Sequence, residues 1–242
     1  MATAGRTVIV TGASQGIGAG VVQAFLARGY NVVGTARNAT NSKELSASDQ
    51  LALIDGDIGQ FETAKKVAEL AIKKFRSIDA VVANVGIYLV KPFTGYTADD
   101  FRALVATNLL GFIYVTQLAV KQMQAQKTGG SIVSITAALA DNPIAGVTAS
   151  LSMITKGGLN AAVRSLALEY AKEHIRFNAV APGVVDTPLH AGTPKQSLKS
   201  ASPMGSISTV EDIASAIIYL TEARQITGEV LRVDGGAHLG KW

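Results

Sequence analysis

The 242-residue sequence predicts a doubly wound α/β fold, in which helices cover both faces of one parallel sheet of about seven strands. Two observations predict this fold. Short apolar segments rich in β-branched residues recur along the chain, as expected of strands buried on both faces. Amphipathic helical segments alternate with them from start to end. No linker-like segment divides the chain, so we expect a single domain over residues 1–242.

The predicted strands and helices follow one another in the order that right-handed βαβ crossovers require. Strands are predicted over residues 7–10, 31–35, 80–83, 131–135, 177–180 and 230–233. Helices are predicted over residues 19–28, 64–75, 99–126 and 152–172. The last two helices are apolar around much of their girth, which indicates a second buried face, for instance in a subunit interface. Residues 187–208 are rich in Pro, Ser and Gly and predict a flexible loop, where a lid would lie.

The composition argues against several classes of protein. Cysteine is absent, which excludes disulfides and thiolate chemistry. The net charge of +4 comes from scattered basic residues, and the pairs Lys65-Lys66 and Lys73-Lys74 fall on the solvent face of a predicted helix. We therefore expect no nucleic-acid site, and no metal site is predicted. The apolar runs are strand-sized and the first six residues leave no room for a secretory signal, so we expect a cytoplasmic protein without a membrane span.

The segment Gly12-Ala13-Ser14-Gln15-Gly16-Ile17-Gly18 joins a predicted strand to a predicted helix. Gly12 permits a tight turn, Gly16 lets a pyrophosphate approach the main chain, and Gly18 lets the helix pack close to the strand. The helix N-terminus supplies free N–H groups and a positive dipole end. These features predict a dinucleotide site. The spacing is G-x-x-x-G-x-G instead of G-x-G-x-x-G, so an ordinary glycine-rich turn is the alternative.

Five ordered segments carry a resemblance to a known family. They are Thr11-Gly12-Ala13-Ser14-Gln15-Gly16-Ile17-Gly18, Asn84-Val85-Gly86, Asn108, Asn178-Ala179-Val180-Ala181-Pro182-Gly183 and Thr227-Gly228-Glu229-Val230-Leu231-Arg232-Val233-Asp234-Gly235-Gly236. Over essentially its whole length, the chain resembles the classical short-chain dehydrogenase/reductase family, whose members have a Rossmann-type fold. The resemblance implies an oxidoreductase acting on a small carbonyl or alcohol substrate. It also implies a homo-oligomer, a tetramer or dimer, joined through the two long apolar helices.

The residues that follow the second predicted strand bear on the choice of nicotinamide cofactor. An acidic residue there would bind the ribose 2′-OH and repel a 2′-phosphate. This chain has Ala36 followed by Arg37, whose guanidinium can pair with that phosphate. NADP(H) is therefore favoured over NAD(H), with a solvated surface residue as the alternative for Arg37.

The family resemblance implies further cofactor-binding residues along the chain. They are Gly12, Ser14, Gln15, Gly16, Ile17 and Gly18 in the glycine turn, Asp57 and Ile58 beside the adenine, Asn84, Gly86 and Lys156, then Pro182 and Gly183, with Val185 and Thr187 at the nicotinamide carboxamide. Ser14 is expected to help hold the phosphate.

The resemblance fails at the catalytic residues. Family enzymes use Asn, Ser, Tyr and Lys, and the phenol donates a proton to the oxygen that hydride transfer makes anionic. No tyrosine in this chain is followed at the fourth position by lysine, and the aligned segment carries Ser152 and Lys156. The serine position holds Ala137, or Thr136 after a shift of one residue. Of the four groups, only Asn108 and Lys156 remain.

Ser152 is a poor substitute for a tyrosine. A phenol has an unperturbed pKa near ~10, whereas an alkyl hydroxyl is a far weaker acid on a shorter side chain. Ser152 acting through a water, or Lys156 with a pKa shifted by desolvation, is a candidate proton donor. His190 on the predicted lid and Tyr88 after the fourth strand are further candidates, each with a surface or wall residue as the alternative.

Three functions therefore stay open. The first is an NADP(H)-dependent oxidoreductase with an unconventional proton donor, in which Lys156 positions the ribose and Asn108 supports a proton relay. The second is a nucleotide-binding sensor, regulatory subunit or scaffold that has lost hydride transfer. The third is a variant whose tyrosine and serine were replaced deliberately.

Overall fold

Seven parallel strands form one sheet in the order β3-β2-β1-β4-β5-β6-β7, in a computed structural model that describes residues 5–239. The strands are β1 (Thr7–Thr11), β2 (Asn31–Ala36), β3 (Leu51–Asp55), β4 (Ala80–Ala83), β5 (Gly130–Ile135), β6 (Ile175–Pro182) and β7 (Val230–Val233). The start of the N-terminal segment considered for a secretory signal, residues 1–4, lies outside the described residues. The predicted parallel sheet of about seven strands is confirmed.

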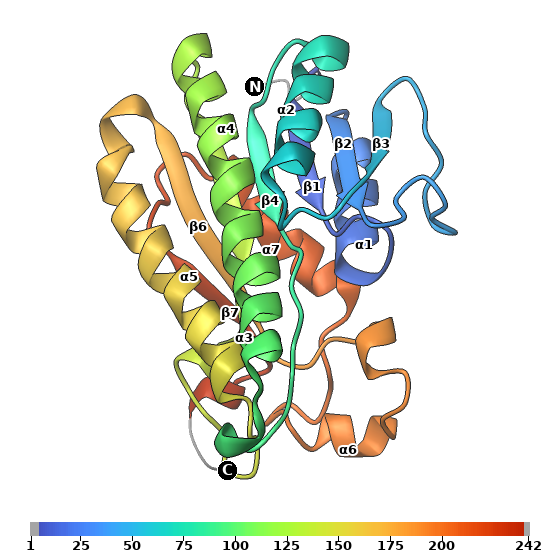
Figure 1. Ribbon diagram of the computed structural model, residues 1–242, viewed down its shortest axis with the longest axis vertical. Coiled ribbons are helices and arrows are strands. Elements are labelled where there is room, and N and C mark those ends of the chain that lie inside the picture. Colours follow the sequence, from blue (N-terminus) through green and yellow to red (C-terminus); the bar gives the residue numbers. More distant parts are fainter. Residues whose placement is uncertain (1–4, 240–242) are drawn as a thin grey trace.

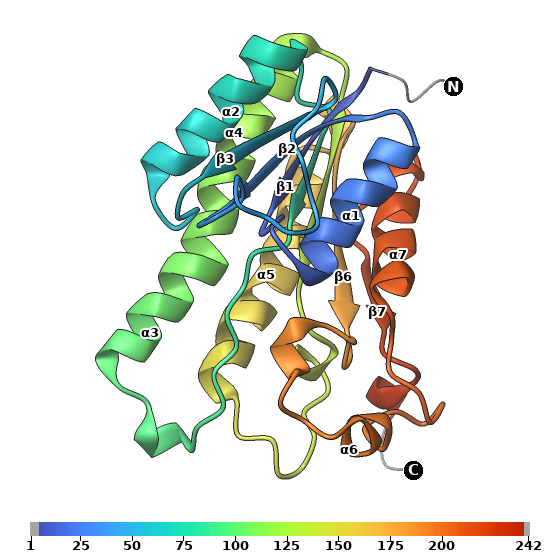
Figure 2. The same cartoon turned by 90° about the vertical axis from the view of Figure 1, so that its right-hand side faces the viewer.

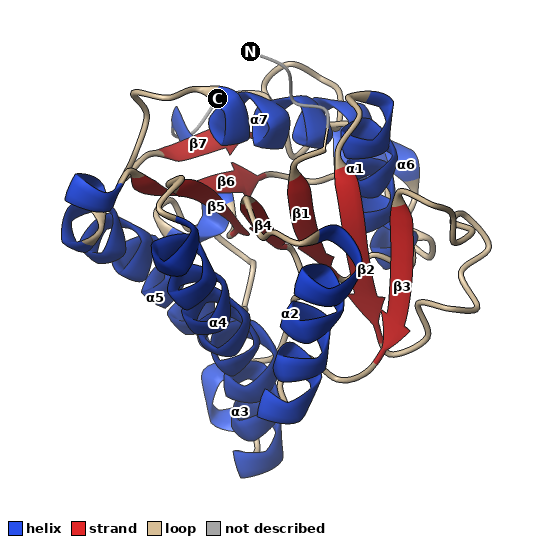
Figure 3. Cartoon of the chain, turned by 90° about the horizontal axis from the view of Figure 1, so that it is seen from above, coloured by secondary structure: helices blue, strands red, loops and turns tan. Residues whose placement is uncertain are grey.

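Helices cover both faces of this sheet, as predicted (Figure 1). They are α1 (Gly16–Ala27), α2 (Phe61–Phe75), α3 (Ala98–Leu104), α4 (Gly111–Gln126), α5 (Ser150–Glu169), α6 (Lys195–Lys199) and α7 (Val210–Glu222). Figure 3 shows α1 and α7 on one face and α2, α4 and α5 on the other. One buried cluster contains Val67, Val115 and Val163 from the second group, and the other contains Phe25 and Ile217 from the first. Each face thus has its own apolar core.

The structure corrects several predicted elements. Strand β3 and helix α7 were not predicted, and the predicted helix over residues 99–126 is α3 and α4 joined by a π-helical segment, Val105–Leu110. The helix predicted over residues 152–172 ends at Glu169, and a separate 3-10 turn follows it. The predicted loop over residues 187–208 contains α6 and a 3-10 turn, Pro188–His190.

The helical run over residues 98–126 also corrects the expectation that apolar runs are only strand-sized. By length and composition alone, this 29-residue run could cross a membrane. In the structure it packs on α2 and on strands β4 and β5, and it buries Phe112, Val115 and Ala119 completely or nearly so. Its apolar face is therefore used in the core of the fold.

Helix α7 is joined to the sheet by a partly buried cation. The Arg176 guanidinium on β6 donates hydrogen bonds to the carbonyl oxygens of Leu220 at 2.7 Å, Thr221 at 2.5 Å and Ile226 at 3.3 Å. Burial lowers the pKa of this guanidinium. These acceptors include carbonyls of the last turn of α7, where a cation is favourable. One side chain of the sheet thus closes the C-terminal end of the helix.

The carboxyl ends of the strands gather the connecting loops at one end of the molecule. The strand order reverses between β1 and β4, which makes this edge a topological switch point. Figure 2 shows α6 beyond the carboxyl ends of β6 and β7, at the same end as the loop that precedes α3. Ligands of such folds bind at this edge, and the candidate site is built there.

Candidate active site

The glycine turn after β1 requires its three glycines. Gly12 and Gly16 adopt positive φ angles of 69° and 57°, which side chains disfavour. A Cβ on Gly18 would collide with the carbonyl oxygen of Gly12. No side chain caps the N-terminus of α1, so its first N–H groups remain for another acceptor. The turn therefore has the open main chain and free donors that suit an anion.

Asn84 ties the end of β4 to this turn. Its Nδ2 donates to the carbonyl oxygens of Thr11 at 2.9 Å and Gly12 at 3.3 Å. The Thr11 hydroxyl in return accepts the main-chain N–H groups of Asn84 at 3.0 Å and Val85 at 3.1 Å. A Cβ on Gly86 would lie 2.8 Å from the Lys156 Nζ. The loop after β4 thus spans the switch point and passes close to Lys156.

Asn108 lies in the π-helical segment and is buried. Its Oδ1 accepts the N–H of Ile87 at 2.8 Å, and its Nδ2 donates to the Ile87 carbonyl at 3.1 Å and to the Thr155 hydroxyl at 2.9 Å. Both Nδ2 protons are used, while Oδ1 keeps one lone pair. Its support of a proton relay stays a prediction.

Lys156 projects from α5 beneath Gly86. Its Nζ donates to the carbonyl oxygen of Ile135 at 2.7 Å, at the end of β5. Burial lowers its pKa to about 8 because the charged ammonium is removed from water. A lysine with such a pKa can exchange its proton near neutral pH.

Ser152, one helical turn before Lys156, has no exposed surface. Its hydroxyl accepts the N–H of Leu89 at 2.9 Å and donates to the Leu89 carbonyl at 3.1 Å. The hydroxyl at the tyrosine position thus holds the loop after β4. The participation of Ser152 in the chemistry stays a prediction. Its hydroxyl already acts as both donor and acceptor to Leu89.

The serine position also lacks an available hydroxyl. Ala137 has none, and the Thr136 hydroxyl is buried against the carbonyl oxygen of Val180 at 3.4 Å. The main-chain N–H of Thr136 donates to the same carbonyl at 2.9 Å. A shift of one residue therefore brings no free hydroxyl to the site.

The other residues expected around a dinucleotide lie along the same edge. Arg37 is exposed just after β2, and the described residues give it no ion-pair partner. Asp57 is exposed and accepts the N–H of Gly59 at 2.9 Å, while Ile58 is buried. The Thr187 side chain lies 3.5 Å from where a Cβ of Gly16 would stand. The end of β6 and the glycine turn are thus brought together.

The predicted lid begins and ends at a short bridge. Val185 is buried and pairs with Ser208, and the N–H of Asp186 donates to the Ser208 carbonyl at 2.9 Å. His190 is half-buried in the segment between Val185 and Ser208, and its main-chain N–H donates to the Thr187 carbonyl at 3.0 Å. The structure describes no contact of this imidazole with Lys156.

Tyr88 is half-buried in the loop after β4. Burial, with a smaller effect of Tyr96, raises its pKa. A proton donor of this kind needs its pKa lowered toward neutrality. Tyr88 is thus a weaker candidate than its position suggested.

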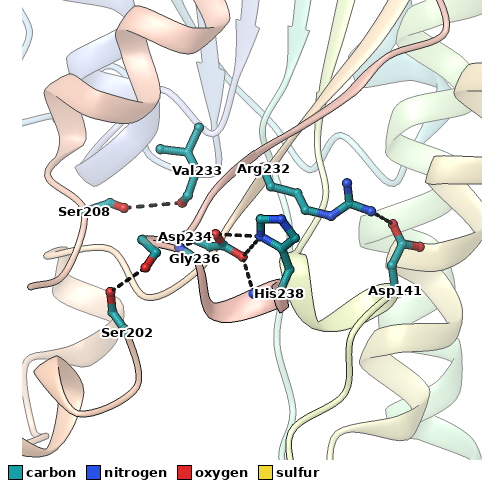
Figure 4. Close-up of polar contacts among 9 residues, drawn as sticks. Asp141, Ser202, Ser208, Arg232, Val233, Asp234, Gly236 and His238 are labelled. Atoms are coloured by element: carbon teal, nitrogen blue, oxygen red, sulfur yellow. Dashed lines mark hydrogen bonds and ion pairs between the residues drawn. The ribbon is translucent and has the colours of Figure 1, made fainter. Parts of the chain in front are cut away.

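Sequence reasoning missed one pair, Asp234 and His238, shown in Figure 4. The buried Asp234 carboxylate lies 2.9 and 3.0 Å from the His238 Nδ1. It also accepts the N–H groups of Gly236 and His238, each at 3.0 Å. The only signal in the sequence is an acid four residues before a histidine in the last motif. A spacing of four residues brings side chains together in a helix, but two glycines lie between these residues, so the sequence gave no reason to pair them.

The fold and the site together indicate the class of protein to which the chain belongs. A doubly wound parallel sheet with a glycine turn at the carboxyl edge of its first strand is typical of Rossmann-type dinucleotide-binding proteins. The family model described as Enoyl-(Acyl carrier protein) reductase matches residues 12–238. The chain belongs to the short-chain dehydrogenase/reductase family of oxidoreductases, as the resemblance predicted.

Known relatives match nearly the whole chain. A tropinone reductase homolog of Arabidopsis thaliana is 32% identical over 96% of this chain and 90% of its own. The 3beta-hydroxysteroid dehydrogenase 1 of Eggerthella lenta is 31% identical over 97% of this chain and 94% of its own.

Solved structures agree with this fold. ElxO with NADP bound is 29% identical, with a TM-score of 0.90 over 97% of this chain and 99% of that one. The 3-ketoacyl-(acyl-carrier-protein) reductase of Brucella melitensis, complexed with NADH, is 26% identical with the same TM-score and the same coverage.

Proposed function

We propose that this protein is an NADP(H)-dependent oxidoreductase that interconverts a small carbonyl compound and its alcohol. The observation that carries the proposal is the continuous set of contacts from the glycine turn through Asn84 to Gly86 and Lys156. This set joins an anion-binding helix terminus to a buried lysine whose pKa is about 8. Such a pairing suits a dinucleotide whose pyrophosphate lies at the helix terminus and whose nicotinamide ribose lies at the buried lysine.

The residues present fit a nicotinamide dinucleotide. The glycine turn and the uncapped N-terminus of α1 would hold the pyrophosphate, and Arg37 would pair with a 2′-phosphate. Lys156, beneath Gly86, would bind the nicotinamide ribose. When bound, the reduced cofactor supplies the hydride. The bound cofactors of the two solved structures differ, NADP in one and NADH in the other, so the preference for NADP(H) rests on Ala36 and Arg37.

The cofactor preference can be tested with R37A. Loss of a charge-assisted guanidinium–phosphate contact is expected to weaken NADPH binding by about 10-fold or more, with NADH binding unchanged. Calorimetric titration of both cofactors measures this, and R164A on the exposed side of α5 serves as the matched control. Equal affinity of the unmodified protein for NADPH and NADH would refute the preference.

The chain's own residues divide the remaining work between positioning and proton transfer. Asn108 fixes the loop at Ile87 and holds Thr155 one residue before Lys156. Ser152 fixes the same loop at Leu89, and its hydroxyl is engaged on both sides. The proton for the substrate oxygen therefore has to come from another group.

Turnover decides between this function and a second one. We expect NADPH consumption with at least one member of a panel of ketones and aldehydes, followed by absorbance in the steady state. The absence of an available hydroxyl at residues 137 and 152 favours the second candidate, a nucleotide-binding sensor or scaffold without hydride transfer. Tight NADPH binding by calorimetry, with no turnover above the uncatalysed rate, would establish that candidate instead.

A further inference from the structure

We propose that His238 is the proton donor of this site and that Asp234 is the residue that positions it. This inference rests on the proposed function, because it concerns the same carbonyl reduction. It supplies the proton donor that Ser152 and Ala137 do not provide.

The pair has the geometry of an oriented imidazole. Both carboxylate oxygens of Asp234 lie within 3.0 Å of the His238 Nδ1 (Figure 4). The carboxylate is buried and accepts two main-chain N–H groups of its own turn, which hold it in place. A carboxylate at Nδ1 keeps the proton on that nitrogen, so Nε2 is the atom free to exchange.

The turn that carries the pair contacts the segments around the active site. A Cβ on Gly183, in the segment after β6 expected to face the nicotinamide, would lie 2.8 Å from the Asp234 Cβ. The 3-10 turn Ala237–Leu239 packs against the 3-10 turn Ala138–Ala140, which begins directly after the vacant serine position. The pair thus lies between the loop after β5 and the loop after β6.

The lid reaches the same turn from its far side. The Ser202 hydroxyl donates to the carbonyl oxygen of Gly235 at 3.3 Å (Figure 4). The N–H of Met204 donates to the same oxygen at 3.3 Å. The His238 side chain nevertheless keeps 28% of its surface exposed. The turn that carries His238 therefore contacts three segments of the site, and the imidazole itself remains accessible to a small molecule.

The neighbouring charges do not compete for the imidazole. The Arg232 guanidinium binds the Asp141 carboxylate at 3.2 Å, and these two opposite charges offset each other (Figure 4). The Asp141 carboxylate also accepts the amide of Asn160 at 3.2 Å. Asp234 is thus the charged group described in direct contact with His238.

The proton balance of the step is simple. The carbonyl carbon gains the hydride that NADPH loses, and the cofactor leaves as NADP⁺. The carbonyl oxygen takes the proton from Nε2 of the His238 imidazolium, which becomes a neutral imidazole. Nε2 then takes up a new proton from the solvent, so the reduction consumes one proton overall, and alcohol oxidation runs the same steps in reverse.

Nuclear magnetic resonance tests the location of His238 without turnover. The chain has three histidines, His174, His190 and His238, so each imidazole can be assigned from single variants. Saturating NADP⁺ with cyclohexanol is expected to shift the ring nitrogens of His238 and to leave those of His174 in place, since His174 precedes β6 at the opposite edge of the sheet. Unmoved His238 signals, with NADP⁺ binding shown by calorimetry, would overturn the inference.

Kinetics test its role. H238Q is expected to lower kcat for ketone reduction by about 100-fold or more, because general acid catalysis contributes on this scale. NADPH affinity and thermal stability should be unchanged, which distinguishes proton donation from a structural role of the turn.

Two further variants complete the experiment. D234N presents a donor to Nδ1 and favours the wrong tautomer, so it should lower kcat by about 10-fold or more. H174N, at a left-handed position that asparagine tolerates, should leave kcat unchanged. An active protein whose H238Q variant keeps its rate within twofold would overturn the inference and leave the proposed function standing. A protein that binds no NADPH would overturn both.

Discussion

At the scale of single residues, Ser152 shows how a replaced side chain acquires another role. The sequence predicts that the tyrosine is missing, because that needs only the spacing to Lys156. It does not predict that the hydroxyl binds Leu89, because that contact joins residues 63 positions apart through the tertiary fold. The missing tyrosine could thus be predicted, and the new partner could not.

Removing this hydroxyl should destabilise the protein. S152A leaves the N–H of Leu89 without a partner, while the Leu89 carbonyl oxygen keeps the hydrogen bond from the Tyr96 hydroxyl at 2.8 Å. The free energy of unfolding should therefore fall by about 1–3 kcal/mol. Urea unfolding measures the change, with S165A on the exposed side of α5 as the control. An effect of S152A no larger than that of S165A would contradict the structural role.

Restoring the family residues should not restore activity by itself. Ser152 has no exposed surface, so a tyrosine there must displace the loop at Leu89. We expect the double variant S152Y/A137S to be less stable than the unmodified protein and to oxidise NADPH no faster with a ketone panel. A gain of about 10-fold or more in rate, a difference of about 1.4 kcal/mol, would instead favour deliberate replacement of the two residues.

The buried Lys156 should leave a signature in the pH dependence of stability. Its pKa is about 8 in the folded protein and 10.5 when unperturbed, so between these values the unfolded chain binds a proton that the native state has released. The free energy of unfolding should therefore rise with pH in this window, relative to K156M, by on the order of 3 kcal/mol. Urea unfolding of both proteins at several pH values measures the difference. A difference that stays constant with pH would contradict the lowered pKa.

Among the secondary-structure elements, β3 and α7 were missed for different reasons. Strand β3 ends in an acid, and its last three residues are not fully buried, so its apolar pattern is incomplete. Helix α7 keeps helical spacing among its buried residues Ile213, Ala214, Ile217 and Ile218, so its pattern was present in the sequence. The π-helical segment that holds Asn108 has no sequence signature, because the helix continues through it in both directions. The change to π-helical geometry at Asn108 is therefore decided by tertiary packing and not by local propensity.

The start of α7 does carry a readable signal. The Thr209 hydroxyl accepts the N–H of Asp212 at 3.2 Å, and the Asp212 carboxylate accepts the N–H of Thr209 at 2.8 Å, which forms a capping box. T209A should lower the free energy of unfolding by about 1 kcal/mol, while T209S should stay close to the unmodified protein. Equal stability of all three proteins in urea would show that the cap contributes nothing.

At the scale of the whole molecule, α5 presents an apolar surface outside the core. Ile154 is 56% exposed and Leu168 is 83% exposed on this helix. We expect the unmodified protein to be a dimer or tetramer and I154K/L168K to be monomeric with an unchanged circular dichroism spectrum, because buried cations would oppose association. Sedimentation velocity measures the mass, and I72K on α2 is the matched control. A monomeric unmodified protein would refute the expected assembly.

The parts of the site differ in how far the sequence could predict them. The glycine turn, Asn84 and Lys156 lie in local motifs, so their meeting at one edge follows from the sheet order. The Asp234–His238 pair depends on a turn that only tertiary contacts define. Short motifs therefore predicted where a dinucleotide would bind, and the fold was needed to find a group able to supply a proton.

The partly buried Arg176 affects the order in which the chain can fold during its synthesis. Its carbonyl acceptors lie 44 to 50 residues further along the chain, so they do not yet exist when β6 leaves the ribosome. Until they emerge, placing β6 in the sheet would partly bury a cation without these acceptors, which is unfavourable. The nascent chain is therefore expected to settle β6 in the sheet only after residues 220–226 have emerged.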